Sequence, residues 1–233
     1  MNLADAVILI TGGNSGLGKS MAENLIKKGS QVIITGRDAA KTEKVAQDLG
    51  CDFFHADVAN DSDIEKTFAF ISDKYGKLDV LINNAGIGGW SPIETLTREQ
   101  MRKVYEVNVF GAAMMAAGAT KIFKKQNYGN IVNIASTASL KGYKNGTIYS
   151  SSKFALRSMS QCWQAELRPY NVRVIQINPS EVPTAFGSES RDERPLEENK
   201  LSPQEIAHAV VSALEMDDRG FIPEVTVHAT NPF

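Results

Sequence analysis

Residues 6–26 read AVILITGGNSGLGKSMAENLI, a short apolar run followed by a glycine loop and an amphipathic segment. Leu17, Met21 and Leu25 recur at helical spacing, so a helix is predicted after the loop. Glycines at a strand-to-helix turn permit a tight bend, and the N–H groups at the start of the helix favour an anion such as a pyrophosphate. We therefore expect this loop to hold a dinucleotide through Gly12, Asn14, Ser15, Gly16, Leu17 and Gly18.

The rest of the chain repeats this alternation of apolar runs and helical segments. Further strands are predicted at 31–35, 51–56, 78–83, 130–135, 172–177 and 224–228, and helices over a segment ending near residue 49 and at 61–75, 97–125, 147–168 and 203–215. The runs are continuously apolar, which is typical of parallel strands covered on both faces. The pattern predicts an α/β fold: a Rossmann-type, doubly wound parallel sheet of about seven strands, with helices on both faces and residues 1–233 forming one domain.

Composition limits the classes of function. The 233 residues carry 25 Lys and Arg against 27 Asp and Glu, a net charge of -2, so a nucleic acid is not an expected partner. No apolar stretch reaches the roughly 18 residues of a membrane span, and no leader segment is visible. Cys51 and Cys162 form no CxxC pair and the three histidines are isolated. We therefore expect no metal site and a reducing, cytoplasmic location.

The ends of the second and third predicted strands bear on the choice of cofactor. NAD-binding folds of this kind carry an acidic residue about 20 residues past the glycine loop, but this chain has Gly36 followed by Arg37. A guanidinium group favours a 2′-phosphate, so NADP(H) is the expected cofactor, with NAD(H) left possible. Asp57 and Val58 are expected to contact the adenine; the alternative is that Asp57 only caps the next turn.

Tyr149 and Lys153 lie four residues apart on a predicted helix and therefore share one face. A phenol is a poor base at neutral pH, and a nearby ammonium group should lower its pKa towards the range useful for proton transfer. Ser136 follows the strand at 130–135, at the edge of the sheet where ligands of such folds bind, and its hydroxyl suits a substrate oxygen. Ser139, in the same short loop, is an alternative for this role.

Together these motifs resemble the short-chain dehydrogenase/reductase family over essentially the whole chain. The TGxxxGxG loop, the NNAG segment at 83–86, Asn108, Ser136 and the Tyr149-x-x-x-Lys153 pair occur in the order and spacing of that family. The resemblance implies that Tyr149 is the general acid and base and that Ser136 orients the substrate oxygen. It also implies that Lys153 binds the nicotinamide ribose and tunes Tyr149.

Other positions take their expected roles from the same resemblance. Asn108 would hold a water that links Lys153 to solvent; its alternative is local bonding to the backbone. Asn84, Ala85 and Gly86 would support the cofactor. The family often has Asn-Pro-Gly where this chain has 178–180, and Ser180 in place of glycine would be strained at a positive φ. The remaining contacts to the nicotinamide are expected from Pro179, Val182 and Thr184.

The resemblance implies an oxidoreductase that uses NADP(H) to interconvert a carbonyl and an alcohol on a small molecule. A short substrate loop is expected around 184–201, with apolar pocket walls from Trp90, Leu140, Tyr143 and Phe186. Asn130 stands where acyl-carrier-protein reductases often have arginine, which weakens the hypothesis of such a reductase without excluding it. An epimerase or dehydratase on the same fold, and a non-catalytic dinucleotide sensor or scaffold, are competing hypotheses.

Assembly into a homodimer or homotetramer is also expected. The predicted helices at 97–125 and 147–168 carry more small and apolar residues than one face of a sheet needs. In the family that they resemble, the equivalent helices form a dimer contact. Phe233, at the end of the chain, is a further candidate for an interface.

Overall fold

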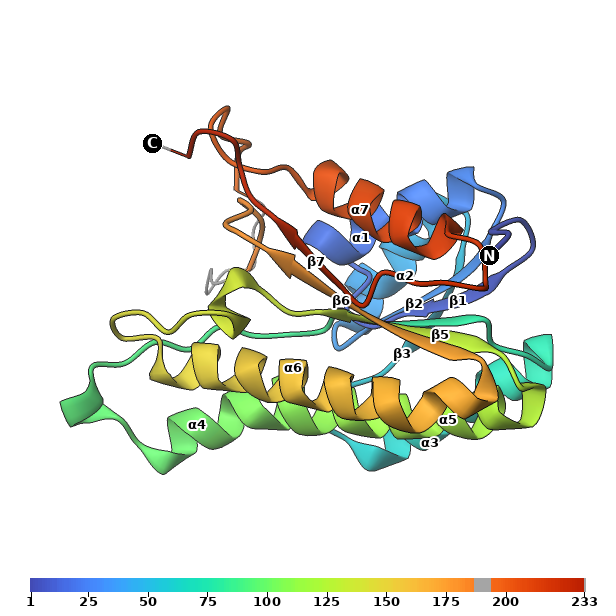
Figure 1. Ribbon diagram of the computed structural model, residues 1–233, viewed down its shortest axis with the longest axis horizontal. Coiled ribbons are helices and arrows are strands. Elements are labelled where there is room, and N and C mark those ends of the chain that lie inside the picture. Colours follow the sequence, from blue (N-terminus) through green and yellow to red (C-terminus); the bar gives the residue numbers. More distant parts are fainter. Residues whose placement is uncertain (187–193, 233) are drawn as a thin grey trace.

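The computed structural model describes residues 1–186 and 194–232 of the chain (Figure 1). Within them one parallel sheet has the strand order β3-β2-β1-β4-β5-β6-β7. Its strands are β1 (Val7–Ile10), β2 (Gln31–Gly36), β3 (Asp52–His55), β4 (Val80–Asn83), β5 (Gly129–Ile134), β6 (Val172–Pro179) and β7 (Glu224–Val227). The predicted fold class is confirmed.

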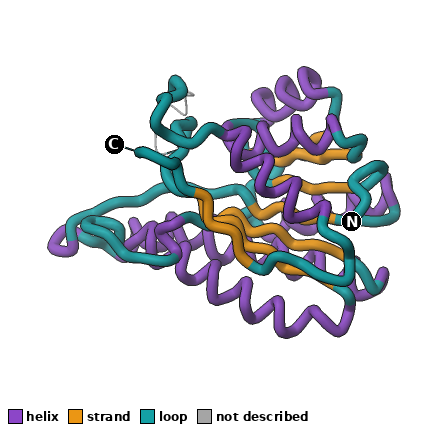
Figure 2. The backbone as a smooth tube through the Cα atoms, turned by 45° about the horizontal axis from the view of Figure 1, so that its top comes forward, coloured by secondary structure: helices purple, strands orange, loops and turns teal. Residues whose placement is uncertain are grey.

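Helices cover both faces of this sheet (Figures 1 and 2). One layer contains α1 (Gly16–Lys27), α2 (Ala39–Leu49) and α7 (Pro203–Glu215). The other contains α3 (Asp61–Tyr75), α4 (Arg98–Tyr105), α5 (Ala112–Gln126) and α6 (Thr147–Leu167). Two of these helices begin at a capping box, in which Thr97 and Ser202 each exchange hydrogen bonds with the residue three positions on.

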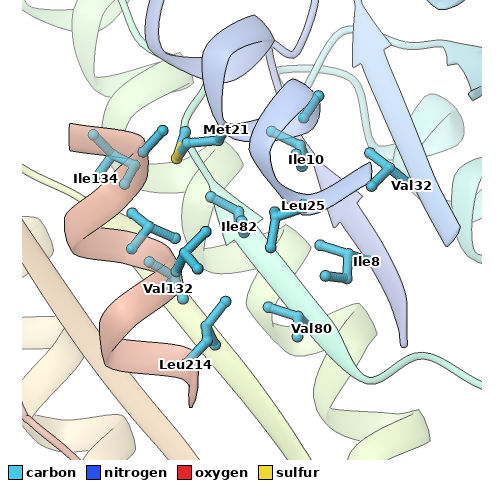
Figure 3. Close-up of a cluster of buried hydrophobic side chains, with 14 of the residues drawn as sticks. Ile8, Ile10, Met21, Leu25, Val32, Val80, Ile82, Val132, Ile134 and Leu214 are labelled. Carbon is cyan, nitrogen blue, oxygen red and sulfur yellow. The ribbon is translucent and has the colours of Figure 1, made fainter. Parts of the chain in front are cut away.

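The central strands are apolar on both faces, and each face packs into its own core. In β1, Ile8 and Ile10 join the cluster beneath α1 and α7, where Leu25 and Leu214 lie (Figure 3). Val7 and Leu9 point the other way and join the cluster under α3 to α6. Successive strand residues face opposite sides, so a buried strand needs apolar residues at every position. This explains the continuous apolar runs of the sequence.

The helix predicted at 97–125 is divided in the structure. Between α4 and α5 lies the π-helical segment η2 (Glu106–Gly111). The buried side chain of Asn108 projects from this segment. Its Oδ1 accepts a hydrogen bond from the backbone N–H of Ile87, and its Nδ2 donates to the Ile87 carbonyl. Gly111 lies so close to Val58 that an added Cβ would be 2.6 Å from the Val58 carbonyl oxygen. The predicted span is therefore helical throughout, and only the π-helical turn was not foreseen, because the tertiary contacts that accompany this local widening leave no mark on helical periodicity.

β1 and β4 are neighbours in the sheet, although β2 and β3 come between them in the sequence. The strand order therefore reverses at this point, with β2 and β3 on one side of β1 and β4 to β7 on the other. The carboxyl edge of the sheet at such a point is where open α/β folds bind ligands. Part of the expected substrate loop, at 187–193, and the interface candidate Phe233 lie outside the described residues. Among the helices that are described, none is long and apolar enough to span a membrane.

Candidate active site

A cavity of about 1280 Å³ opens at the carboxyl edge of the sheet. Loops that follow β1 to β6 and the start of α6 form its walls. Every predicted site residue lines it except Gly18 and Asn108, namely Gly12, Asn14, Ser15, Gly16, Leu17, Arg37, Asp57, Val58, Asn84, Ala85, Gly86, Ser136, Tyr149, Lys153, Pro179, Val182 and Thr184. The structure therefore brings together residues that lie up to 172 positions apart (from Gly12 to Thr184) in one place.

The glycine loop is held in shape by its own backbone and by Asn84. Gly12 and Gly16 adopt positive φ angles of 63° and 48°, which a side chain would disfavour. The amide nitrogen Nδ2 of Asn84 donates to the carbonyl oxygens of Thr11 and Gly12, at 2.9 and 3.0 Å. Ser15, at the N-cap of α1, gives no side-chain capping bond. A helix start that opens on a cavity without such a cap fits a pyrophosphate.

Gly18 supports the loop from behind and does not line the cavity. A Cβ at this position would overlap the carbonyl oxygen of Gly12 and lie 2.9 Å from Cα of Gly13. Its role is therefore close packing of α1 against the glycine loop, which is the part the third glycine of such motifs plays. It is a supporting residue here, and its predicted direct contact with a cofactor stays untested.

The end of β2 has no room for an acidic side chain. A Cβ on Gly36 would overlap Nδ2 of Asn14, which donates to Oγ1 of Thr42 at 2.8 Å. Arg37 follows and lines the cavity, as does Lys41 in the first turn of α2. Lys41 was not identified from the sequence. Its position as a second basic residue, four positions after Arg37, could have indicated that it reaches the same part of the cavity. Two cations thus lie where the acid of an NAD-binding fold would be expected.

Asp57 caps the next turn, as its alternative interpretation predicted, and it also lines the cavity. Its Oδ1 accepts from the backbone N–H of Ala59 at 3.0 Å, and its own N–H donates to Oδ2 of Asp63. Val58 beside it is buried and lines the same wall. An adenine contact and a turn cap are therefore compatible at Asp57, since the carboxylate has further acceptor sites.

Tyr149 and Lys153 both project from the first half of α6 into the cavity. The Lys153 ammonium lies 5.7 Å from the centre of the Tyr149 ring and donates to the Ile134 carbonyl at 2.8 Å. Ser136 lies at the cavity wall, where its Oγ accepts from the N–H of Ala138. Ser139 is fully buried and donates to Asn178, so of the two serines only Ser136 faces the cavity.

Burial controls the protonation of this pair. It raises the pKa of Tyr149 well above the usual phenol value, and a hydrogen bond with Ser136 opposes the rise. Burial lowers the pKa of Lys153 to about 8. The net shift in the pKa of the phenol is therefore opposite to the lowering expected from the sequence, because desolvation of the phenolate is the largest influence on it. At neutral pH the pair is a phenol beside a largely protonated amine.

Asn108 lies behind the catalytic pair. Its Oδ1 accepts from the N–H of Ile87, while Nδ2 donates to the Ile87 carbonyl and to Oγ of Ser152. These bonds reach residues 21 and 44 positions away and include a side chain, so they differ from the backbone-only bonding considered as the alternative. A Cβ on Gly86 would lie 3.4 Å from Oδ1 of Asn108 and 3.8 Å from Nζ of Lys153, so the segment after β4 packs beside both side chains. The water relay remains a prediction.

Ser180 is free of the strain considered from the sequence. It is absent from the residues with positive φ, and its N–H donates to the Val227 carbonyl at 2.9 Å. The β6–β7 pairing thus extends past Pro179 with ordinary backbone angles. Ser180 lines the cavity together with Pro179, Val182 and Thr184.

The other end of the cavity is lined by the four predicted wall residues, Trp90, Leu140, Tyr143 and Phe186. Three further side chains line the same cavity, namely Lys141, Arg194 and His228. Arg194 belongs to the loop expected around 184–201, and the other two were not identified from the sequence. Asn130 is fully buried and accepts from Nε of Arg173 at 2.6 Å. Because a side chain at this position does not reach the surface, its identity says little about binding of an acyl-carrier protein. Within the described part of the chain, no cluster of His, Cys, Asp or Glu suits a metal ion.

The chain is similar to known proteins over nearly its whole length. Residues 6–195 match the family described as short chain dehydrogenase. An uncharacterized oxidoreductase of Staphylococcus aureus (strain USA300) is 32% identical over 228 residues, 97% of each chain. The structure of an alcohol dehydrogenase from the archaeon Thermococcus sibiricus, complexed with 5-hydroxy-NADP, is similar with a TM-score of 0.89, 28% identity and coverage of 97% of each chain. A 3-ketoacyl-(acyl-carrier-protein) reductase from Brucella melitensis, complexed with NADH, is similar with a TM-score of 0.88 and 27% identity, covering 99% of this chain and 100% of that one.

Proposed function

This chain belongs to the short-chain dehydrogenase family of oxidoreductases, and on that premise we propose that it interconverts a carbonyl and an alcohol with NADP(H) as the preferred cofactor. The observation that carries the proposal is the presence of Ser136, Tyr149 and Lys153 in the same cavity as the glycine loop. A sensor or scaffold would not need a proton donor at the position where the cofactor and a substrate meet. The intact set therefore favours an enzyme.

The chain's own residues account for the proton transfer. In the direction of reduction, the phenol of Tyr149 donates its proton to the carbonyl oxygen as the hydride arrives at the carbon, and its raised pKa means that it is protonated at neutral pH. Ser136 binds the same oxygen as negative charge develops on it. Lys153, held by the Ile134 carbonyl, places a positive charge beside the phenol. The nicotinamide, when bound, supplies or accepts the hydride.

The preference for NADP(H) rests on Arg37 and Lys41. Both side chains line the cavity where β2 ends, and the space for an acidic residue at Gly36 is filled by Asn14 and Thr42. Two cations would bind a 2′-phosphate through charge-assisted hydrogen bonds. The similar structures do not decide the matter, since one was solved with an NADP derivative and another with NADH.

The test is oxidation of NADPH and of NADH, followed by absorbance, over a panel of ketones, aldehydes and diketones. We expect turnover with NADPH that is lost in Tyr149→Phe while cofactor affinity stays within a few-fold. Tyr170→Phe is the matched control, because Tyr170 lies at the surface against Lys124 and outside the cavity. Retained turnover in Tyr149→Phe would exclude the assigned role. Tight cofactor binding with no turnover over the whole panel would favour the sensor.

We also propose that the chain assembles through the outer surface of η2, α5 and α6. Phe110, Met114 and Phe154 are exposed there to 51%, 46% and 41%, on segments whose small residues allow close approach. Large exposed apolar side chains on neighbouring helices are typical of an interface. Light scattering after gel filtration should give a multiple of the 25.4 kDa chain mass, and Phe154→Glu should shift it towards the monomer.

A further inference from the structure

Two aromatic side chains stand half-exposed inside the cavity, next to the proposed proton donor. Trp90 comes from the segment after β4 and Tyr143 from the loop before α6, and they are 49% and 46% exposed. Nε1 of Trp90 donates to the Tyr143 hydroxyl at 3.0 Å, which joins the two loops. We call these two residues the aromatic platform. Large apolar surface left open within a concave site is typical of ligand binding.

Each ring of the platform lies directly on the backbone of a glycine. A Cβ added to Gly88 would be 2.5 Å from Cζ3 of Trp90, and one added to Gly146 would be 2.7 Å from Cζ of Tyr143. Neither glycine has a positive φ, so backbone conformation does not require glycine at either position. An added methyl group would instead meet the ring, so each ring packs against the main chain of its own loop. Together with the Trp90–Tyr143 hydrogen bond, this packing orients the two rings.

The platform continues onto the ring of Tyr149 itself. The ring centres of Trp90 and Tyr149 are 6.0 Å apart, and Phe186 lies 5.5 Å from Tyr149 on a further contact. Two aromatic rings therefore contact the ring of the proposed proton donor. A substrate whose carbonyl is bonded to a flat ring would place that ring on the platform while the oxygen reaches Tyr149.

Resting on the proposed carbonyl reduction, we propose that the substrate is an aryl or similarly conjugated planar ketone or aldehyde, bound on the Trp90–Tyr143 platform. A substrate with a carboxylate would instead use the basic side chains of Lys141 or Arg194. A carboxylate substrate of that kind would leave the exposed rings of Trp90 and Tyr143 without a flat group to pack against. Small aliphatic ketones would cover little of either ring.

The first experiment moves the platform without touching the catalytic residues. In Gly88→Ala the added methyl group must displace Trp90, whereas in the control Gly220→Ala it meets only Cε of Met216 at 3.6 Å, and neither Gly220 nor Met216 lines the cavity. With NADPH, we expect kcat/KM for acetophenone to exceed that for butan-2-one and for pyruvate by at least about tenfold. Gly88→Ala should lose about tenfold on acetophenone and less than about threefold on butan-2-one, with Gly220→Ala unchanged on both.

Equal losses on both ketones, or a wild-type preference for butan-2-one or pyruvate, would overturn the proposal. A second readout does not depend on turnover. The chain has two tryptophans, so Trp163→Phe leaves Trp90 as the single fluorophore of this kind, and Tyr149→Phe in the same chain prevents reaction. We expect saturable quenching of Trp90 by acetophenone in the presence of NADP⁺, weakened in Gly88→Ala.

The two readouts separate the two proposals. Saturable quenching without turnover of any carbonyl by the wild type would leave the aromatic platform standing and reject the reductase. Turnover of butan-2-one or pyruvate without quenching by acetophenone would keep the reductase and reject the platform as a substrate site. Absence of both signals would reject both.

Discussion

The two ends of the cavity are built in different ways. At the cofactor end, the glycine loop has its main chain fixed by Asn84 and Thr11 with hydrogen bonds near 3.0 Å, and side chains such as Arg37 and Lys41 lie beside it. At the substrate end, side chains from separate loops form the surface, and Trp90 and Tyr143 remain about half exposed. Main chain that binds a constant ligand tolerates little change, whereas side chains on loops can vary with the substrate. We therefore expect the first end to bind the cofactor and the second end to select the substrate.

The largest expected effect comes from breaking the main-chain surface. Gly18→Ala places a Cβ against the Gly12 carbonyl and 2.6 Å from Nδ2 of Asn84, and neither can move without deforming the glycine loop. Overpacking of this kind costs about 1–3 kcal/mol. We expect affinity for NADPH and NADH to fall together by about 100-fold, measured by fluorescence titration. Gly220→Ala is again the control, and a loss confined to one cofactor would contradict a role in the shape of the loop.

A smaller and selective effect is expected from the side chains of the same end. Arg37→Ala should weaken NADPH by about 10–30-fold, the value of one hydrogen bond to a charged group, and leave NADH within about threefold. Arg102→Ala, on the exposed face of α4, is the matched loss of charge outside the cavity. Equal losses of NADPH and NADH affinity would refute the 2′-phosphate assignment. Lys41→Ala in the same titration measures how much the second cation contributes to NADPH affinity.

The sequence predicted residue by residue which positions line the cavity around the glycine loop, and the opposite end only in outline. Strand periodicity and the spacing of Gly12, Gly16 and Gly18 are local signals, so they identify the sheet, the loop and the helix start from the chain alone. Trp90 and Tyr143 were expected as walls, but their pairing depends on two loops meeting in space. Lys141, Arg194 and His228 reach the cavity from loops with no recognisable motif.

Tertiary contacts also explain what the sequence did not indicate near the catalytic pair. The π-helical turn at Asn108 depends on Ile87, which lies 21 positions earlier in the chain. The raised pKa of Tyr149 depends on burial, which residue spacing does not measure. The choice between Ser136 and Ser139 depends on which of them faces the cavity, and a one-turn loop offers no periodicity to decide it.

Lys153 lies where the two ends of the cavity meet. Its titration should change the free energy of unfolding of the protein with pH. Burial lowers the pKa of Lys153 from 10.5 to about 8. Between pH 8 and 10.5 the unfolded state therefore binds more protons than the native state, so stability rises with pH through that window. Lys153→Met lacks this rise. From about pH 7 to about pH 9.5, the free energy of unfolding of the wild type should gain about 1–2 kcal/mol relative to the variant.

Urea unfolding at a fixed protein concentration measures this difference. The upper limit of about pH 9.5 keeps the experiment below the titration of Tyr149, whose pKa is raised and would act with the opposite sign. Lys121→Met, at an exposed position of α5, is the control for loss of a lysine charge. Parallel curves for wild type and Lys153→Met would mean that Lys153 is not buried as an ammonium ion.

Substitution of Ser180 is expected to have the smallest effect on stability and activity. A small effect would show that not every main-chain segment along the cofactor end depends on a glycine. Although Ser180 lines the cofactor end, its φ is not positive and its N–H continues the β6–β7 pairing to Val227. Ser180→Gly relieves no strain and adds freedom to the unfolded chain, so the free energy of unfolding should fall by up to about 1 kcal/mol. Because the backbone that faces the cofactor keeps its path, kcat/KM should change by less than about twofold. A marked gain in cofactor affinity would mean instead that the main chain at the end of β6 changes conformation when the cofactor binds. Residue 180 would then need a backbone conformation that favours glycine.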